Sequence, residues 1–120
     1  MNEPTTLTTE ERPNGVKVIH IHGDLDSMGT HMVEKSFESA LDGPTQRVVV
    51  DMQDVSFISS AGMAMLLVKG KNLRQQRGQL VLAGASERVR EVLALAGFNE
   101  LFDMYPTVDD AVNALAPAES

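Results

Sequence analysis

The 120-residue sequence predicts a single α/β domain, with a mixed, mostly parallel sheet of about five strands and about four helices. Two observations support this prediction. Short runs of β-branched residues alternate with segments whose apolar residues recur every three or four positions, as strands and helices do in α/β folds. In addition, the three valines at 48–50 form an unbroken apolar run, which is typical of a parallel strand buried on both faces.

The N-terminal part predicts a β-hairpin, a helix and the buried strand. Asn14 and Gly15 tolerate positive φ and favour a tight turn between the first two strands. We expect Ser27 or Thr30 to cap the helix, and Gly43 with Pro44 to end it. The elements, in order, are strand 5–12, turn 13–15, strand 16–22, a break at 23–27, a helix with the apolar stripe Val33, Phe37, Ala40 and Leu41, a stop at 42–44, and strand 47–52.

The C-terminal part predicts three helices that alternate with two strands. Gly78 and Gly97 are expected to end the first two helices, Ser86 to cap the second, and Pro106 with Thr107 to open the third. The elements, in order, are a helix from about Ser60 to Arg77, strand 79–83, a helix with the stripe Val89, Val92, Leu93 and Ala96, a short strand within 100–105, and a helix that buries Ala111, Val112 and Leu115. The domain is expected to span residues 5–116, with flexible tails at 1–4 and 117–120.

For the helix after residue 60, the apolar pattern predicts which side faces the core. The expected buried face carries Ala61, Ala64, Leu67 and Leu73, widened by Met63 and Leu66. The basic side chains of this helix are expected to face mostly outward.

The amino-acid composition indicates which classes of binding partner and which cellular location to expect. Ten Lys and Arg against seventeen Asp and Glu give a net charge of −7, so we expect no nucleic-acid binding and no attraction to an anionic membrane. The sequence has no cysteine, which excludes disulfides and thiolate chemistry. It shows no signal-peptide pattern and no apolar run of the length that a membrane span needs. We therefore expect a cytoplasmic protein without membrane insertion.

Catalytic, metal and nucleotide motifs are not evident. The three histidines, His20, His22 and His31, do not stand where one would serve as a base for a serine nucleophile. His20 and His22 share one face of a strand and Asp24 or Asp26 could approach them, but a metal site needs three or four convergent ligands. Neither glycine-rich phosphate-loop motif is present. We expect no enzyme activity, no cofactor and no metal.

The turn at residues 59–62 is the strongest candidate for a functional site. It lies between the buried strand and the long helix, where the first N–H groups of the helix are unpaired and the helix dipole is positive. A hydroxyl at this point can cap the helix or carry a phosphate, and the residues alone leave both uses open. The loops at 23–27 and 83–86 are expected at the same edge of the sheet, where they would help to form a docking face.

The sequence from Asp51 resembles the signature of the STAS domain, in particular that of bacterial anti-sigma-factor antagonists. The matching residues are Asp51-x-x-x-Val55-x-Phe57-Ile58-x-Ser60-x-Gly62-Met63. Further matches, over about residues 5–115, are Gly23-Asp24-Leu25-Asp26, Leu80-Val81-Leu82, Val89-x-x-Val92-Leu93-x-x-x-Gly97-Phe98 and Leu101-Phe102.

The resemblance implies a partner switch. An unphosphorylated antagonist binds an anti-sigma factor that is also a serine kinase, and thereby releases a sigma factor. Phosphorylation of the turn serine ends the binding, and a PP2C-type phosphatase resets the switch. Counted back from Gly62, the acceptor is Ser60, and Asp26 matches an acidic residue near it.

Ser59 is the one departure from the pattern within the turn, because the family has Asp at this position. The carboxylate beside the acceptor is therefore missing, and Ser59 is the alternative acceptor to Ser60. The residues expected to bind the partner are Asp24, Asp26, Ser27, Ser59, Ser60, Ala61, Gly62 and Met63.

Two other functions stay open. One is a STAS subunit of another assembly, such as an ABC-type lipid-transport system or a stress-signalling scaffold. The other is an enzyme that acts on a small molecule, which would need a convergent acid and base. The choice between monomer and dimer is open as well.

Overall fold

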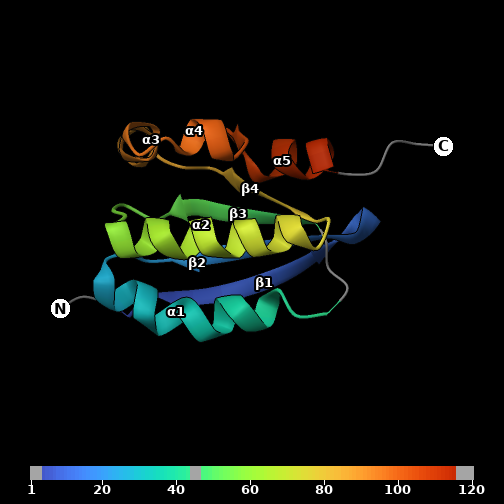
Figure 1. Cartoon of the computed structure of the whole chain (residues 1–120), viewed down its shortest axis with the longest axis horizontal. Helices are drawn as coiled ribbons and strands as arrows, with labels where there is room; N and C mark the ends of the chain where they lie inside the picture. The colour runs from blue at the N-terminus through green and yellow to red at the C-terminus, as the bar shows by residue number, and fades with distance from the viewer. Residues whose placement is uncertain (1–3, 44–46, 116–120) are drawn as a thin grey trace.

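The computed structural model describes residues 4–43 and 47–115 (Figure 1). Most of the two expected tails, the end of the expected domain at residue 116, and Pro44 lie outside the described residues. The secondary structure follows the predicted order of a hairpin and then alternating helices and strands.

The described residues form one five-stranded sheet in the order β1-β2-β3-β4-β5. Strand β1 pairs antiparallel with β2, and the remaining neighbours pair in parallel, which confirms the predicted mixed, mostly parallel sheet. A 3-10 turn at Pro13–Gly15 joins β1 to β2, with Asn14 and Gly15 at φ 72° and 76°. The strands are β1 (Thr6–Arg12), β2 (Val16–His22), β3 (Arg47–Asp54), β4 (Gln79–Ala83) and β5 (Met104–Tyr105).

Helices cover both faces of this sheet, and one layer is much larger than the other. Helices α1 and α2 run side by side across one face (Figure 1), and α3 and α4 contribute to the same core. Helix α5 packs on the opposite face. The helices are α1 (Ser27–Ala40), α2 (Ser60–Gln75), α3 (Glu87–Leu95), α4 (Phe98–Leu101) and α5 (Val108–Leu115).

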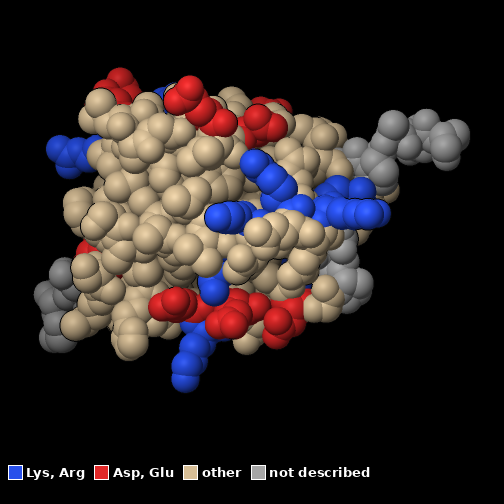
Figure 2. Space-filling view, in the orientation of Figure 1, with Lys and Arg blue, Asp and Glu red and all other residues tan. Residues whose placement is uncertain are grey.

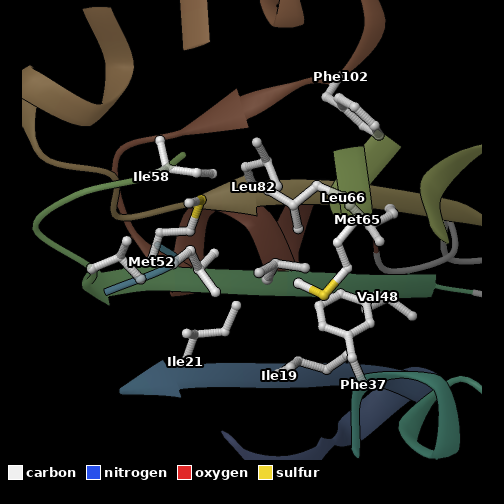
Figure 3. Packing of buried hydrophobic residues seen from close by; sticks show 14 of the residues in the cluster. Ile19, Ile21, Phe37, Val48, Met52, Ile58, Met65, Leu66, Leu82 and Phe102 are labelled. Atoms are coloured by element: carbon white, nitrogen blue, oxygen red, sulfur yellow. The ribbon is translucent and has the colours of Figure 1, made fainter. Parts of the chain in front are cut away.

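Strand β3 lies between the two layers, so its side chains are buried on both sides. Val48 and Val50 belong to the large core and Val49 to the small core under α5, and all three are fully buried. This confirms that the apolar run marks a central parallel strand. Figure 3 shows the large core, in which Phe37 of α1 and Leu66 of α2 meet side chains from β2, β3 and β4.

The predicted buried face of α2 is only partly correct, since Leu66 and Leu73 are buried as expected. Ala64 and Leu67 are exposed, whereas the buried residues are Gly62, Met65, Leu66, Gly70 and Leu73. The two glycines decide the orientation, because both lie where neighbouring residues approach the helix too closely for a side chain. Similarly, Ala96 was assigned to the buried stripe of α3 but is exposed, because α3 ends at Leu95.

The C-terminal half contains one unpredicted helix and one helix end that differs from prediction. The short strand expected within 100–105 is confirmed, since Met104 and Tyr105 pair with β4, but the one-turn helix α4 that precedes it was not predicted. Helix α2 ends at Gln75, and Arg77 rather than Gly78 takes the left-handed conformation, with φ 67°. The Gly78 N–H then donates to the Leu73 carbonyl at 2.8 Å, which closes the helix end.

Candidate functional site at the carboxyl ends of the strands

Two loops, which follow β2 and β3, are joined beside the start of α2. Leu25 and Ile58 form an isolated parallel bridge between them. The Leu25 N–H donates to the Phe57 carbonyl at 2.9 Å, and the Ser59 N–H donates to the Leu25 carbonyl at 2.9 Å. The side chains of Leu25 and Ile58 are both buried, which anchors the joined loops to the core. The first residues of α2 therefore start from a fixed backbone.

Ser59 is the N-cap of α2. Its Oγ accepts a hydrogen bond from the Gly62 N–H at 3.2 Å and donates one to the Leu25 carbonyl at 2.8 Å. The hydroxyl thus pairs one unsatisfied N–H of the helix and ties the cap to the neighbouring loop. An ionised Asp at this position has no proton to donate to Leu25. The departure from the family pattern therefore supplies a hydrogen bond that an ionised carboxylate cannot make.

Ser60 is the first residue of α2 and is exposed. Its hydroxyl makes no hydrogen bond within residues 4–43 and 47–115. It lies where the unpaired N–H groups and the positive end of the helix dipole favour an anion. The sequence left open whether a hydroxyl of this turn caps the helix or carries a phosphate. In the structure, Ser59 caps the helix and Ser60 presents a solvent-facing hydroxyl.

The expected cap of α1 is wrong. The N-cap is Asp26, whose carboxylate accepts from the Gly29 N–H at 2.7 Å, whereas Ser27 is the exposed first residue of the helix and Thr30 is buried within it. The chain enters the helix one residue before the expected serine, and Asp caps a helix as well as Ser does. Asp26 nevertheless remains exposed at the loop edge.

Asp24 has a structural role in the same loop. Its carboxylate accepts from the Ser56 N–H at 3.1 Å, and its carbonyl accepts from the Thr5 hydroxyl at 2.7 Å. These bonds connect the loop after β2 to the loop after β3 and to the residue that precedes β1. Of the acidic residues predicted for partner binding, Asp26 is therefore the more accessible.

The three residues after Ser60 differ in exposure. Gly62 is buried, and a Cβ there would lie 2.8 Å from the Leu25 carbonyl oxygen. The missing side chain at Gly62 therefore permits close packing beneath the turn. Ala61 and Met63 are half-buried and flank it.

Phe57, a residue of the matching motif, lies at the surface of the loop edge. Its side chain is 51% exposed, next to the buried Ile58. The bridge between Leu25 and Ile58 explains this, because adjacent residues of an extended segment point to opposite sides. The same alternation, visible in the sequence, could have identified Phe57 as an apolar contact residue of the loop edge.

The third loop of this edge follows β4 and leads into α3. The Ser86 hydroxyl accepts from the Val89 N–H at 3.2 Å, which confirms the predicted cap of this helix.

His20 and His22 lie on the sheet face opposite α2. They alternate with Ile19 and Ile21, which pack in the large core, and their rings stack 6.3 Å apart. His20 contacts carboxylates of both neighbouring strands, Asp51 at 2.6 Å and Glu10 at 2.9 Å. Partial burial alone would lower the pKa of His20, but the hydrogen bonds to Glu10 and Asp51 outweigh it and raise the pKa above its usual value.

These histidines hold the edge strand rather than activate a serine. His22 contacts Asp54 at 2.9 Å and Thr8 at 3.1 Å, so both imidazoles join β2 to its neighbours. A hollow of about 760 Å³ lies between α3 and β5; its lining includes Ala85 of the loop after β4 but neither Ser60 nor the loops after β2 and β3. Within residues 4–43 and 47–115, no three His, Asp or Glu side chains converge as a metal site would require. In that same part of the chain, none of the helices has the length and apolar character to cross a bilayer.

The fold and this edge define a small α/β domain that presents a serine hydroxyl at a fixed helix start. The sequence comparison identifies the family. The model of the STAS domain matches residues 8–111, and the chain belongs to this family.

Individual relatives agree in length and fold. BtrV of Bordetella bronchiseptica, provisionally named an anti-sigma factor antagonist, is 31% identical over 110 residues, which cover 92% of this chain and 95% of that protein. A crystal structure of a Thermotoga maritima protein with the same provisional name has a TM-score of 0.85 at 18% identity, covering 92% and 95% of the two chains. The phosphorylated form of the Bacillus cell fate determinant SpoIIAA has a TM-score of 0.70 at 21% identity, covering 91% and 98%.

Proposed function

We propose that this protein is an anti-sigma factor antagonist that binds an anti-sigma factor through the loop edge around Ser60. Relatives that align with most of the chain carry this name, which supports the proposal over a transport or scaffold subunit. The main supporting observation is that the two serines of the turn have different structural roles. Ser59 is fully engaged as a cap, whereas the Ser60 hydroxyl is exposed and can be modified without loss of the cap.

In this proposal the chain has no catalytic activity of its own and acts in the cytoplasm through the domain at residues 5–116. The anti-sigma factor is a serine kinase, and a PP2C-type phosphatase removes the phosphate. A phosphate on Ser60 adds about two negative charges and is tolerated at a helix N-terminus. This charge adds to that of the exposed Asp26 at the same edge. We expect the added negative charge to weaken docking of the partner without unfolding the domain.

Incubation with the anti-sigma kinase and ATP, followed by mass spectrometry, tests the acceptor. We expect one phosphate on Ser60 in the wild type and in Ser59→Ala, and none in Ser60→Ala. A phosphate on Ser59, or none on either serine, would contradict the assignment.

Calorimetric titration of the antagonist with the anti-sigma factor tests the switch. Ser60→Asp is expected to weaken binding at least about tenfold, or ~1.4 kcal/mol, because it places a charge at the docking edge. Ser60→Ala is expected to bind like the wild type and to resist inactivation by ATP. Equal binding by Ser60→Asp would refute the electrostatic switch, and a wild-type chain that binds no anti-sigma factor would refute the proposed function.

A further inference from the structure

The outward side of α2 forms a continuous ridge that begins at Ser60. Its residues follow one another at intervals of four, three, four and three, which places them on one side of a helix. All five are exposed, and they span about 21 Å at 1.5 Å per residue. The members of this α2 ridge are Ser60, Ala64, Leu67, Lys71 and Arg74.

Charge on α2 is opposite to that of the chain as a whole. The helix carries Lys69, Lys71 and Arg74 and no acidic residue, although the chain has a net charge of −7. Figure 2 shows Lys and Arg side chains gathered over the C-terminal half of α2. Lys69 is paired with Glu38 of α1 at 4.0 Å, whereas Lys71 has no ion-pair partner in residues 4–43 and 47–115.

The middle of the ridge is apolar. Leu67 is 40% exposed, and the adjacent Val68 is 51% exposed. Arg74 donates to the Leu101 carbonyl at 3.0 Å, which fixes the guanidinium at the far end of the ridge. The ridge therefore presents, in order, a hydroxyl, a small and apolar segment, and a basic end.

Acidic side chains lie on both sides of the basic segment. In Figure 2, Asp and Glu form one group below it, on the side of α1, and another above it, on the side of α3 and α4. The exposed acidic residues of these helices include Glu34 and Glu38 of α1 and Glu87 and Glu91 of α3. A flat anionic surface, such as a membrane, would meet these carboxylates as well as the ridge, and the chain's net charge of −7 opposes its binding. A single helix laid along α2 would meet the ridge alone.

We propose that the α2 ridge docks an amphipathic helix of the anti-sigma factor whose contact face is apolar in the middle and acidic at the end near Lys71 and Arg74. This inference rests on the proposed function and extends its contact surface along α2. The apolar part of the partner helix packs on Leu67 and Val68, and its carboxylates pair with the basic end. Ser60 is the first member of the same ridge, so a phosphate there lies under the docked helix and must be desolvated against it.

Matched single substitutions test the ridge in titrations with the anti-sigma factor. Lys71→Glu is expected to weaken binding about tenfold, and Lys35→Glu, the same change at an exposed site on α1, less than about twofold. The difference should shrink at high ionic strength, since exposed ion pairs are screened by salt. Leu67→Asp is expected to weaken binding by a similar factor, and Leu95→Asp, at a 91% exposed position on α3, to leave it unchanged.

The outcomes separate this inference from the proposed function. If Ser60→Asp weakens binding but Lys71→Glu and Leu67→Asp bind like the wild type, the proposed function stands and the ridge is refuted. If the wild type binds no anti-sigma factor, both are refuted. Binding of the wild-type chain to phosphatidylglycerol vesicles that is lost in Lys71→Glu would assign the ridge to a membrane and overturn the helix proposal. Circular dichroism of each variant checks that α2 is intact.

Discussion

Helix α2 has two long sides that resemble each other in sequence and differ in role. The inward side carries Gly62, Leu66, Gly70 and Leu73, which are buried against the large core. The outward side is the α2 ridge, which is exposed along its whole length. Both sides combine small residues with leucine at helical spacing. Their difference shows that the period of an apolar pattern identifies a helix but does not decide which side of it is buried.

The largest expected effect compares two adjacent leucines. Leu66→Ala removes a fully buried side chain and should lower the free energy of unfolding by about 2–5 kcal/mol. Leu67→Ala, on the ridge, should change it by less than about 0.5 kcal/mol. Urea unfolding at equilibrium measures both. Equal losses would mean that the two sides of α2 are wrongly assigned.

The second comparison concerns the glycine beside Phe102. A Cβ at Gly70 would overlap the Phe102 ring, which is buried and contacts Phe98 with ring centres 5.3 Å apart. Overpacking of this kind costs about 1–3 kcal/mol, from which the helix preference of Ala over Gly, about 1 kcal/mol, is subtracted. We therefore expect Gly70→Ala to lose about 1 kcal/mol in urea unfolding. Relief of the overlap by Phe102→Leu in the same chain should make the effect of Gly70→Ala smaller, and a constant effect would argue against the contact.

The third comparison concerns the stability effects of replacing Ser59, the helix cap, and Ser60, the first residue of the ridge. Ser59→Ala removes a capping acceptor and the donor to Leu25, and should destabilise the fold by about 1 kcal/mol. Ser60→Ala removes an exposed hydroxyl and should leave the thermal midpoint nearly unchanged. Thermal unfolding followed by circular dichroism measures both. A larger loss in Ser60→Ala than in Ser59→Ala would reverse the roles assigned to the two serines.

The smallest expected effect lies away from α2 and concerns the pH dependence of stability at His20. The pKa of His20 is raised by its hydrogen bonds to Glu10 and Asp51 despite the burial that opposes it, so the folded chain binds this proton more tightly than the unfolded chain. The resulting stability is fully present below the ordinary histidine pKa, about 6.5, and is lost as pH rises through the raised value in the fold.

Replacement of this histidine removes the pH effect. In His20→Gln, the thermal midpoint should fall less between about pH 6 and pH 8 than it does in the wild type. Thermal scans at several pH values provide the test, with His31→Gln as the control because His31 is exposed on α1. An unchanged pH dependence of the thermal midpoint in His20→Gln would show that the His20 imidazole is not its cause.

Much of the fold was predictable because its signals are local. The valines at 48–50 marked the central strand, and Asn14 with Gly15 marked the hairpin turn. Ser86 was correctly predicted as a cap, since the capping bond joins residues three apart. The one-turn helix at Phe98–Leu101 was not predicted, because four residues are too few to produce a recognisable period.

The candidate site was predictable in place but not in detail. The strand–turn–helix order located the serine turn at the edge of the sheet. It did not distinguish Ser59 from Ser60, because the acceptor of the Ser59 hydroxyl is the carbonyl of Leu25, 34 residues earlier in the chain. Nor did it show that Phe57 is exposed, which follows from the bridge between Leu25 and Ile58.

The sequence by itself determined the order of the elements apart from the short helix α4, the mixed and mostly parallel sheet, and a serine-bearing turn before α2. These follow from periodicity, turn residues and helix signals, which act over a few residues. Only the tertiary structure decided which side of α2 is buried and which serine is exposed. Those outcomes depend on the packing of Phe102 against Gly70 and on the contacts of Leu25 with Gly62 and Ser59. The partners in these contacts are distant in sequence and meet only when the chain is folded.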